Sequence, residues 1–155
     1  MRLHIRQAVP SDLPQILALY AQPAMDNGRV LSLQDAQNLF GQFSLYPNYR
    51  LFVACPSLGD DAAAAEEVIG TYALLVMHNL AHQGTPSAIV EDVVVKAECQ
   101  SQGVGRQMMV HAMGLAREAG CYKLVLSSNQ KRERAHAFYE SLGFVRHGYS
   151  FLMEM

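Results

Sequence analysis

Polar and apolar residues alternate at the start of the chain in blocks that predict one strand and then two helices. Residues 3–9 alternate with the period of two of a strand that has one buried face. Ser11 stands at the N-cap position of residues 11–20, in which apolar side chains recur at the spacing of one helix face. Ser32, with Asp35 three residues on as in a capping box, starts a second stretch with this spacing, which predicts a second helix that Pro47 ends.

Strands dominate the middle of the chain. Runs rich in β-branched and other apolar residues predict strands at 50–55, 68–77 and 87–95. The acidic and alanine-rich residues 59–67 predict an exposed connection between the first two of these strands. Apolar residues then recur at helical spacing over 104–119, and Gly120 stands where a left-handed glycine commonly ends a helix.

The last part of the chain predicts a strand, a helix and a closing strand region. Residues 121–128 have a largely apolar middle, residues 133–142 have one apolar helix face before Gly143, and residues 144–155 predict one bent strand or two short ones. The predicted order is β-α-α-β-β-β-α-β-α-β, which indicates an α/β fold. Because 155 residues without an internal repeat or linker suit one domain, we expect a single domain over 1–155.

Charge and composition exclude several classes of protein. The net charge is −2, but residues 1–95 hold 4 basic against 9 acidic residues, while residues 96–155 hold 8 against 5. The second part is therefore the better host for an anion, although it lacks the dense basic stripe of a nucleic-acid-binding protein. We expect no nucleic-acid partner.

No segment predicts a membrane span, a secretory signal or a metal site. No apolar run approaches the roughly 20 residues that a membrane-spanning helix needs, and the first residues lack the pattern of a signal peptide. The 3 cysteines are too few and too widely spaced for a disulfide framework or a zinc site. We therefore expect a cytoplasmic protein that neither binds a membrane nor holds a metal ion.

The stretch QSQGVGR, residues 100–106, places Gly103 and Gly105 between a predicted strand and a predicted helix. Bare backbone beside the unpaired N–H groups of a helix start can hold a phosphate. The same glycines could instead make only a tight turn. A dinucleotide fingerprint would need a third glycine where Met108 stands, and the motif of a nucleoside-triphosphate-binding loop is absent from the sequence.

QSQGVG also resembles the [Q/R]xxGx[G/A] motif of the GNAT family of N-acetyltransferases, and it follows a strand, VEDVVV, as in that family. Residues 5–19 resemble the opening strand and helix of the family, and 135–144, AHAFYESLGF, resemble its late helix and the strand after it. The resemblance implies one acyl-CoA N-acyltransferase domain with a mixed, mostly antiparallel sheet of six or seven strands and about four helices.

Two subfamilies share segments with this chain. EDVVV, GCYKLVL and FYESLGF resemble glucosamine-6-phosphate N-acetyltransferases, whereas SSNQKRERAHAFY resembles aminoalkylphosphonate N-acetyltransferases. The resemblance therefore implies an acetyltransferase that uses acetyl-CoA and acts on the primary amine of a small, phosphorylated or otherwise anionic molecule. Proteins or peptides are alternative acceptors, and a sensor that binds acetyl-CoA without turnover is an alternative function.

The resemblance assigns cofactor and catalytic roles to single residues. Glu91 or Asp92 would take the proton of the amine, with Glu91 favoured by the resemblance as the acid that faces the cleft. Tyr139 would protonate the leaving thiolate, uphill by about 1.5 pKa units or about 2 kcal/mol. The residues expected to contact acetyl-CoA are Val93, Val95, Gln100, Gln102, Gly103, Val104, Gly105, Arg106, Asn129 and Arg132.

The acceptor pocket and the oligomeric state are open to weaker predictions. We expect the amine to bind among loops, namely residues 23–32, 77–87 and 145–150. Arg29, Arg50, His82, Arg146 and His147 are candidates to hold an anionic group of the acceptor. The apolar end of the chain, FLMEM, suggests a homodimer.

Overall fold

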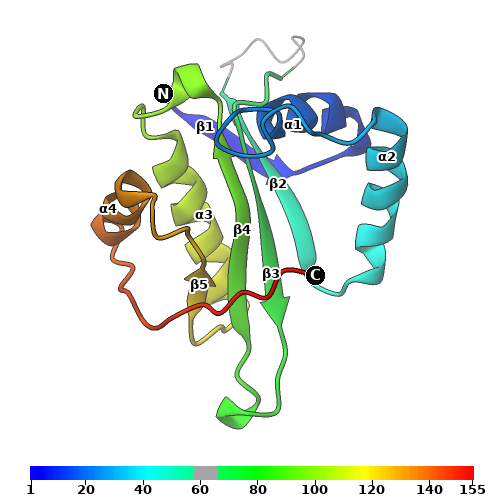
Figure 1. The fold of residues 1–155 in the computed structure, drawn as a ribbon. Coiled ribbons are helices and arrows are strands. Elements are labelled where there is room, and N and C mark those ends of the chain that lie inside the picture. Colours follow the sequence, from blue (N-terminus) through cyan, green and yellow to red (C-terminus); the bar gives the residue numbers. More distant parts are fainter. Residues whose placement is uncertain (58–65) are drawn as a thin grey trace. The chain divides into compact units, whose positions relative to one another are not determined.

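A five-stranded sheet in the order β1-β2-β3-β4-β5 is the frame of this computed structural model, which describes residues 1–57 and 66–155 (Figure 1). Most of the predicted connection at 59–67 therefore lies outside the described residues. The chain forms two compact units, Met1–Val125 and Leu126–Met155.

The elements from β1 to α4 follow the predicted order. The strands are β1 (Leu3–Gln7), β2 (Tyr49–Pro56), β3 (Gly70–Met77), β4 (Ser87–Val95) and β5 (Leu124–Leu126). The α-helices are α1 (Leu13–Tyr20), α2 (Leu33–Gln42), α3 (Val104–Glu118) and α4 (Glu133–Ser141). Short 3-10 helices cover Pro10–Asp12, Phe43–Leu45, His82–Gly84 and Ala97–Cys99.

The sheet is mixed and mostly antiparallel, as predicted. β1 to β4 are antiparallel neighbours. The chain entering β5 runs parallel to β4, because the N–H of Tyr122 donates to the carbonyl of Pro86 and the N–H of Ala88 donates to that of Lys123, both at 3.0 Å. The connection from β4 to β5 through α3 is thus a crossover, which places the start of α3 beyond the end of β4.

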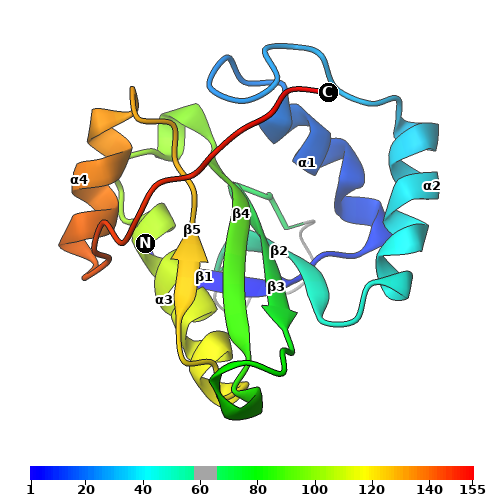
Figure 2. The ribbon, with the colours of Figure 1, turned by 60° about the horizontal axis from the view of Figure 1, so that its bottom comes forward.

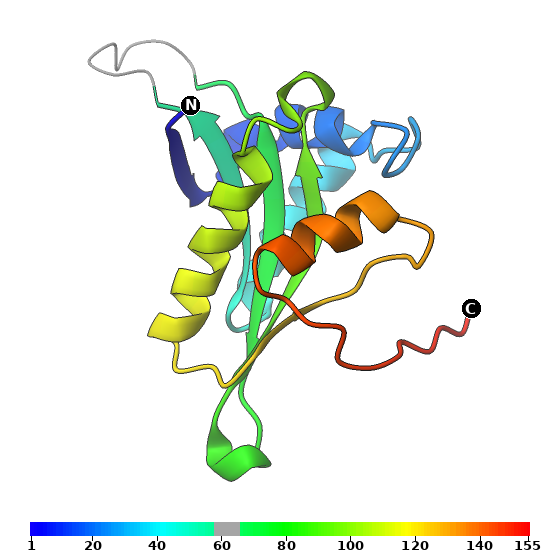
Figure 3. The same cartoon turned by 90° about the vertical axis from the view of Figure 1, so that its left-hand side faces the viewer.

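Helices cover both faces of the sheet: α1 and α2 lie on one face and α3 lies on the other (Figures 2 and 3). Successive side chains of β2 point to opposite faces. Val53 belongs to the core cluster that includes Ile16 of α1, whereas Phe52 stacks on Tyr72 of β3 and meets the ring of His111 of α3 at 5.3 Å. Strands buried on both faces explain the continuous apolar runs in the sequence.

One glycine allows α3 to pack closely on the sheet. A Cβ atom at Gly70 would lie 2.6 Å from the sulfur of Met108 and 3.4 Å from a methyl group of Val104. Both α3 residues are buried, and Met108 has no exposed surface. The absence of a side chain at Gly70 therefore fixes the distance between the first turns of α3 and the sheet.

The turn from β1 to α1 is held by an ion-pair network that we call the β1–α1 corner (Arg6, Asp12, Glu66 and His4). Arg6 donates two hydrogen bonds to Asp12, at 2.7 and 2.9 Å, and one to Glu66 at 2.8 Å. His4 contacts the other oxygen of Glu66 at 2.7 Å. Asp12 also accepts from the N–H of Val9 at 2.8 Å. Asp12, rather than the predicted Ser11, precedes α1, because Pro10–Asp12 form a 3-10 turn that leads into the helix.

The second unit contains the end of β5, α4 and the residues up to Met155. The predicted strand region at 144–155 is wrong: these residues, all of which the structure describes, form neither helix nor strand. Phe144 is half-buried, but the apolar side chains after it, including Val145 and Phe151, are exposed. Polar residues and Gly148 interrupt the alternation, and three apolar residues follow one another from Phe151, so the segment cannot present one apolar face to a sheet. The sheet consequently has five strands in the described residues, not six or seven.

Candidate functional site

β4 has a bulge at Glu91 and Asp92, the two acids predicted as candidate bases. Thr71 of β3 lies opposite Val94, and Ala73 lies opposite Glu91, so β4 has one residue more than β3 over this interval. Asp92 is the residue that absorbs the difference, with a left-handed φ of 52°. Because the bulge interrupts the alternation of side chains, alternation alone does not decide which acid faces which side of the sheet.

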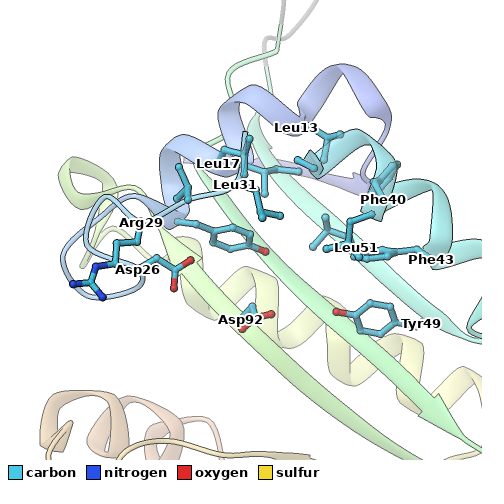
Figure 4. A pocket seen from close by; sticks show the side chains of 15 residues that line it. Leu13, Leu17, Asp26, Arg29, Leu31, Phe40, Phe43, Tyr49, Leu51 and Asp92 are labelled. Atoms are coloured by element: carbon cyan, nitrogen blue, oxygen red, sulfur yellow. The ribbon is translucent and has the colours of Figure 1, made fainter. Parts of the chain in front are cut away.

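A cavity of about 520 Å³ lies on the α1 and α2 side of the sheet, with Asp92 in its wall (Figure 4). Its walls come from both helices, the loop between them, β2 and β4. The loop was the first of the three segments expected to surround the acceptor. The lining residues are Leu13, Ile16, Leu17, Tyr20, Asp26, Arg29, Val30, Leu31, Ala36, Leu39, Phe40, Phe43, Tyr49, Leu51 and Asp92.

Two acids meet at one end of this cavity. Figure 4 shows the carboxylate of Asp26 directed toward Asp92. Burial raises the pKa of Asp92, and the negative charge of Asp26 raises it further. Burial, followed by the charge of Asp92, also raises the pKa of Glu91. Glu91, which the resemblance favoured for the cleft, is not among the described residues that line the cavity.

Two tyrosines supply hydroxyl groups to the same cavity. Burial raises the pKa of Tyr20, as does the charge of Asp92, and the same two causes raise the pKa of Tyr49. Both phenols therefore keep their protons near neutral pH and can donate hydrogen bonds. Sequence reasoning placed Tyr20 in the predicted helix at 11–20 and Asp26 in the acceptor loop at 23–32 without giving either side chain a role, and it passed over Tyr49. Their positions beside loops were the available signal.

The glycine stretch forms the start of α3. Gly103 has a left-handed φ of 84° at the N-cap, and its carbonyl accepts from the N–H of Gln107 at 3.1 Å. Among the described residues, no side chain caps this helix. The N–H groups of Val104, Gly105 and Arg106 belong to the first helical turn and so have no partner within the helix. They form a donor set suited to an anion at the positive end of a helix of 15 residues.

The end of β4 offers main-chain groups on the side away from β3. Lys96 donates its N–H to Ile69 at 2.8 Å, on the β3 side. The preceding carbonyl, that of Val95, accepts instead from the side-chain amides of Gln100 at 3.3 Å and Gln22 at 3.4 Å. These bonds are long and come from side chains that can move, so another amide could replace them. Val93 is half-buried beside the bulge.

The remaining predicted residues belong to the second unit. Tyr139 lies half-buried in α4, with its ring near Phe138 and Phe144 at centroid distances of 5.1 and 5.9 Å. Burial raises the pKa of Tyr139, and the positive charge of Arg132 acts in the opposite direction. The structure thus brings together the acid, the end of β4 and the glycine loop within the first unit, and it places Tyr139 and Arg132 in the second.

Asn129 organises the turn before α4. Its side-chain oxygen accepts the N–H of Lys131 at 2.9 Å, and its carbonyl accepts the N–H of Arg132 at 2.9 Å. The ring of His136 makes a contact of 3.0 Å with the same carbonyl. His136 therefore has a partner within its own unit.

Neither a metal-binding cluster nor a membrane-spanning helix occurs among the described residues. No three His, Cys, Asp or Glu side chains lie close enough together there to hold a metal ion. In the same residues, no helix is long and apolar enough to cross a membrane.

Comparisons with known proteins agree on one family. The sequence profile described as "Acetyltransferase (GNAT) family" matches residues 15–144. A rice protein (Oryza sativa subsp. japonica) named "Probable glucosamine 6-phosphate N-acetyltransferase 2" is 32% identical over 125 residues, which cover 71% of this chain and 74% of the rice protein. Aminoalkylphosphonate N-acetyltransferase of Salmonella typhimurium (strain LT2) is 29% identical over 149 residues, covering 95% and 88%.

A solved structure from Agrobacterium tumefaciens str. C58, provisionally named an acetyltransferase, superimposes with a TM-score of 0.85. It is 32% identical to this chain, and the match covers 98% of this chain and 99% of that one. The likeness extends over both compact units.

Proposed function

The chain belongs to the GNAT family and is an N-acetyltransferase; we propose that it transfers the acetyl group of acetyl-CoA to the primary amine of a small molecule, by direct attack in a ternary complex. One observation carries the proposal: residues 92–106, which we call the β4–α3 segment, hold an acid with a raised pKa at a bulge and an uncapped helix start. The names of the relatives put phosphorylated and phosphonate amines among the candidate acceptors.

The residues of the β4–α3 segment fit acetyl-CoA, which supplies an activated acetyl thioester when it is bound. The N–H groups from Gln102 to Arg106 would hold its diphosphate, because fixed main-chain donors at a helix start favour an anion. The main chain of Val93 and Val95 would pair with the amides of the pantetheine arm, displacing the glutamine side chains. Gln100 opens the loop, and Asn129 and Arg132 are proposed contacts from the second unit.

Asp92 is the proposed base, directly or through a water molecule. An alkylamine resembles lysine, with a pKa of about 10.4, and an ordinary aspartate has a pKa of about 3.9, so the proton transfer is uphill by about 9 kcal/mol. Burial and Asp26 raise the pKa of Asp92 and so reduce this cost. Glu91 is the alternative base.

The remaining steps follow from the groups that the chain provides. The amine nitrogen forms a bond to the acetyl carbon while the carbon–sulfur bond breaks, and Tyr139 donates a proton to the leaving thiolate. A main-chain N–H after the bulge would stabilise the negative charge that develops on the carbonyl oxygen. The products are an amide and CoA. Both compact units then act as one domain over 1–155.

The test is thiol release from acetyl-CoA in the presence of single amines, with the Tyr139→Phe variant and a matched control. Tyr46→Phe is the control, since Tyr46 is 60% exposed and is not among the described residues that line the cavity. We expect release that depends on the amine, a loss of about 100-fold in kcat for Tyr139→Phe, and little change for Tyr46→Phe. Binding of acetyl-CoA without release to any amine would favour a sensor, and no binding would refute the role of the glycine loop.

A further inference from the structure

The cavity beside Asp92 has mainly apolar walls. Ten of its fifteen lining side chains are aliphatic or phenylalanine. Leu31 and Leu39 line it although they are 48% and 46% exposed, and Phe40 and Phe43 lie between the helix and the sheet. Exposed apolar side chains at a concave surface gain from being covered by an apolar ligand. A sugar or another body rich in hydroxyl groups would find few hydrogen-bonding partners along this wall.

The charged groups of the cavity favour a cation. Asp26 and Asp92 stand against one basic side chain, Arg29, so the lining carries a charge of 1 − 2 = −1. Figure 4 shows the guanidinium of Arg29 directed away from the apolar wall and the carboxylate of Asp26 directed toward Asp92. The negative charge of Asp26 acts on Asp92, and an ammonium group held by both carboxylates would relieve that repulsion. A phosphate dianion would instead add to it.

Three of the other four basic residues that were expected to hold an anion contact other groups. Arg50 lies over the ring of Phe52 at 5.4 Å, and the ring of His82 packs on that of Tyr122 at 4.4 Å. Arg146, in the second unit, donates to Glu140 at 2.7 Å.

We infer that the acceptor is a primary amine attached to an apolar body, an alkyl- or arylalkylamine, whose ammonium group binds between Asp26 and Asp92 and whose body lies on Leu31, Leu39, Phe40 and Phe43. The inference rests on the proposed function, because Asp92 must also take the proton that this ammonium group loses. It changes none of the bonds made or broken. It replaces the anionic acceptor suggested by the names of the relatives with a cationic, apolar one.

The first experiment compares acceptors on the wild-type protein at saturating acetyl-CoA. The panel is 2-phenylethylamine and hexylamine, ethanolamine as a short polar control, and 2-aminoethylphosphonate and glucosamine 6-phosphate as anionic amines. We expect kcat/KM for the two apolar amines to exceed that for the anionic ones by about tenfold or more. A preference for the anionic amines would overturn this inference and leave the proposed function standing. Turnover of no amine would overturn both.

Paired variants test the apolar wall and the acid separately. Leu39→Gln should raise the KM for 2-phenylethylamine by about tenfold, with little effect on ethanolamine. Leu33→Gln is its control, since Leu33 lies on the same helix, is 43% exposed and is absent from the described lining. Equal effects of the two leucine variants would overturn the role of the wall.

Asp26→Asn should bring the kcat/KM values for 2-phenylethylamine and 2-aminoethylphosphonate closer together, because it removes a charge that attracts the first amine and repels the second. Glu118→Gln is the control: it removes the same charge from an exposed position on α3, on the opposite face of the sheet. An unchanged ratio of the two kcat/KM values in Asp26→Asn would overturn the proposed ammonium site.

Discussion

The β1–α1 corner and the β4–α3 segment differ in how their charged groups are paired and in their backbone geometry. In the corner, Arg6 binds both Asp12 and Glu66, and Asp12 also takes a main-chain N–H. In the segment, Asp92 lines a cavity together with another acid, Asp26, and the start of α3 carries no side-chain cap from the described residues. The corner also has ordinary backbone geometry, whereas the segment contains left-handed residues at Asp92, Ser101 and Gly103.

The difference separates groups that stabilise the fold from groups left available to a ligand. Pairing and hydrogen bonding lower the free energy of the corner in the folded state. Strained backbone and a carboxylate beside a like charge raise the free energy of the segment, and such costs are common at functional sites. Substitutions in the two regions should therefore affect stability and activity in opposite proportions.

The largest expected effect is on activity and comes from Asp92→Asn. Loss of a general base should lower kcat/KM by about 100- to 10,000-fold. The melting temperature should stay unchanged or rise, because asparagine also tolerates a left-handed φ and the repulsion from Asp26 disappears. Thiol-release kinetics and thermal unfolding measure the two quantities.

The pH dependence and Glu91→Gln sharpen this test. Because the pKa of Asp92 is raised, wild-type activity should be present above that pKa and fall as the pH decreases through it, at a pH above about 3.9. This acidic limb should be absent from the residual activity of Asp92→Asn. If Glu91→Gln loses the activity and Asp92→Asn keeps it, Glu91 is the base.

Next in size is the effect of Arg6→Met on stability. The substitution leaves Asp12, which is 4% exposed, with its charge buried and without its cation, at a cost of about 3 kcal/mol. For a chain of this size we expect the melting temperature to fall by about 10 °C, with kcat retained at temperatures where the variant is folded. Urea unfolding followed by circular dichroism measures the loss.

Arg146→Met is the control for that variant, since Arg146 forms a single, exposed ion pair with Glu140. It should change the free energy of unfolding far less than Arg6→Met does. A similar loss in both variants would mean that burial and multiple bonding do not distinguish the corner.

A smaller effect is expected from alanine at the two ends of α3. Gly103 and Gly120 have φ values of 84° and 72°, and a Cβ atom at either would meet no described atom within 4 Å. Each Gly→Ala change should therefore cost about 1 kcal/mol through backbone strain alone. Only Gly103→Ala should also raise the KM for acetyl-CoA. Equal KM values for the two variants would argue against the glycine loop as the diphosphate site.

The mildest expected effect is the acid dependence of the corner. Burial alone would raise the pKa of Asp12, but hydrogen bonds from Arg6 and from the N–H of Val9 outweigh it and lower the pKa. A lowered folded-state pKa means that this stabilisation is present above the unfolded value of about 3.9 and is lost as the pH falls through the folded value. Urea unfolding between pH 7 and 3 should show that the free energy of unfolding falls more steeply for wild type than for Asp12→Asn. Parallel plots of that free energy against pH would contradict this role of Asp12.

Local patterns in the sequence anticipated much of the architecture. Ser32 caps α2 as predicted, accepting the N–H of Asp35 at 3.1 Å, and Gly120 ends α3 with a left-handed φ. Such features depend on a few neighbouring residues, so the sequence shows them directly. Residues 144–155 show the limit of this reasoning, because their apolar residues suggested a strand although they do not alternate regularly enough to form one apolar face.

By itself, the sequence determined the order of the elements from β1 to α4, the glycine loop and the family, because each of these depends on residues adjacent in the chain. Only the tertiary structure decided that Asp92, not Glu91, lines the cavity with Asp26. The side that an acid faces depends on the extra residue that β4 has relative to β3, which exists only when the two strands pair. The cavity likewise requires α1, α2 and the sheet to pack together, and no local pattern encodes that packing.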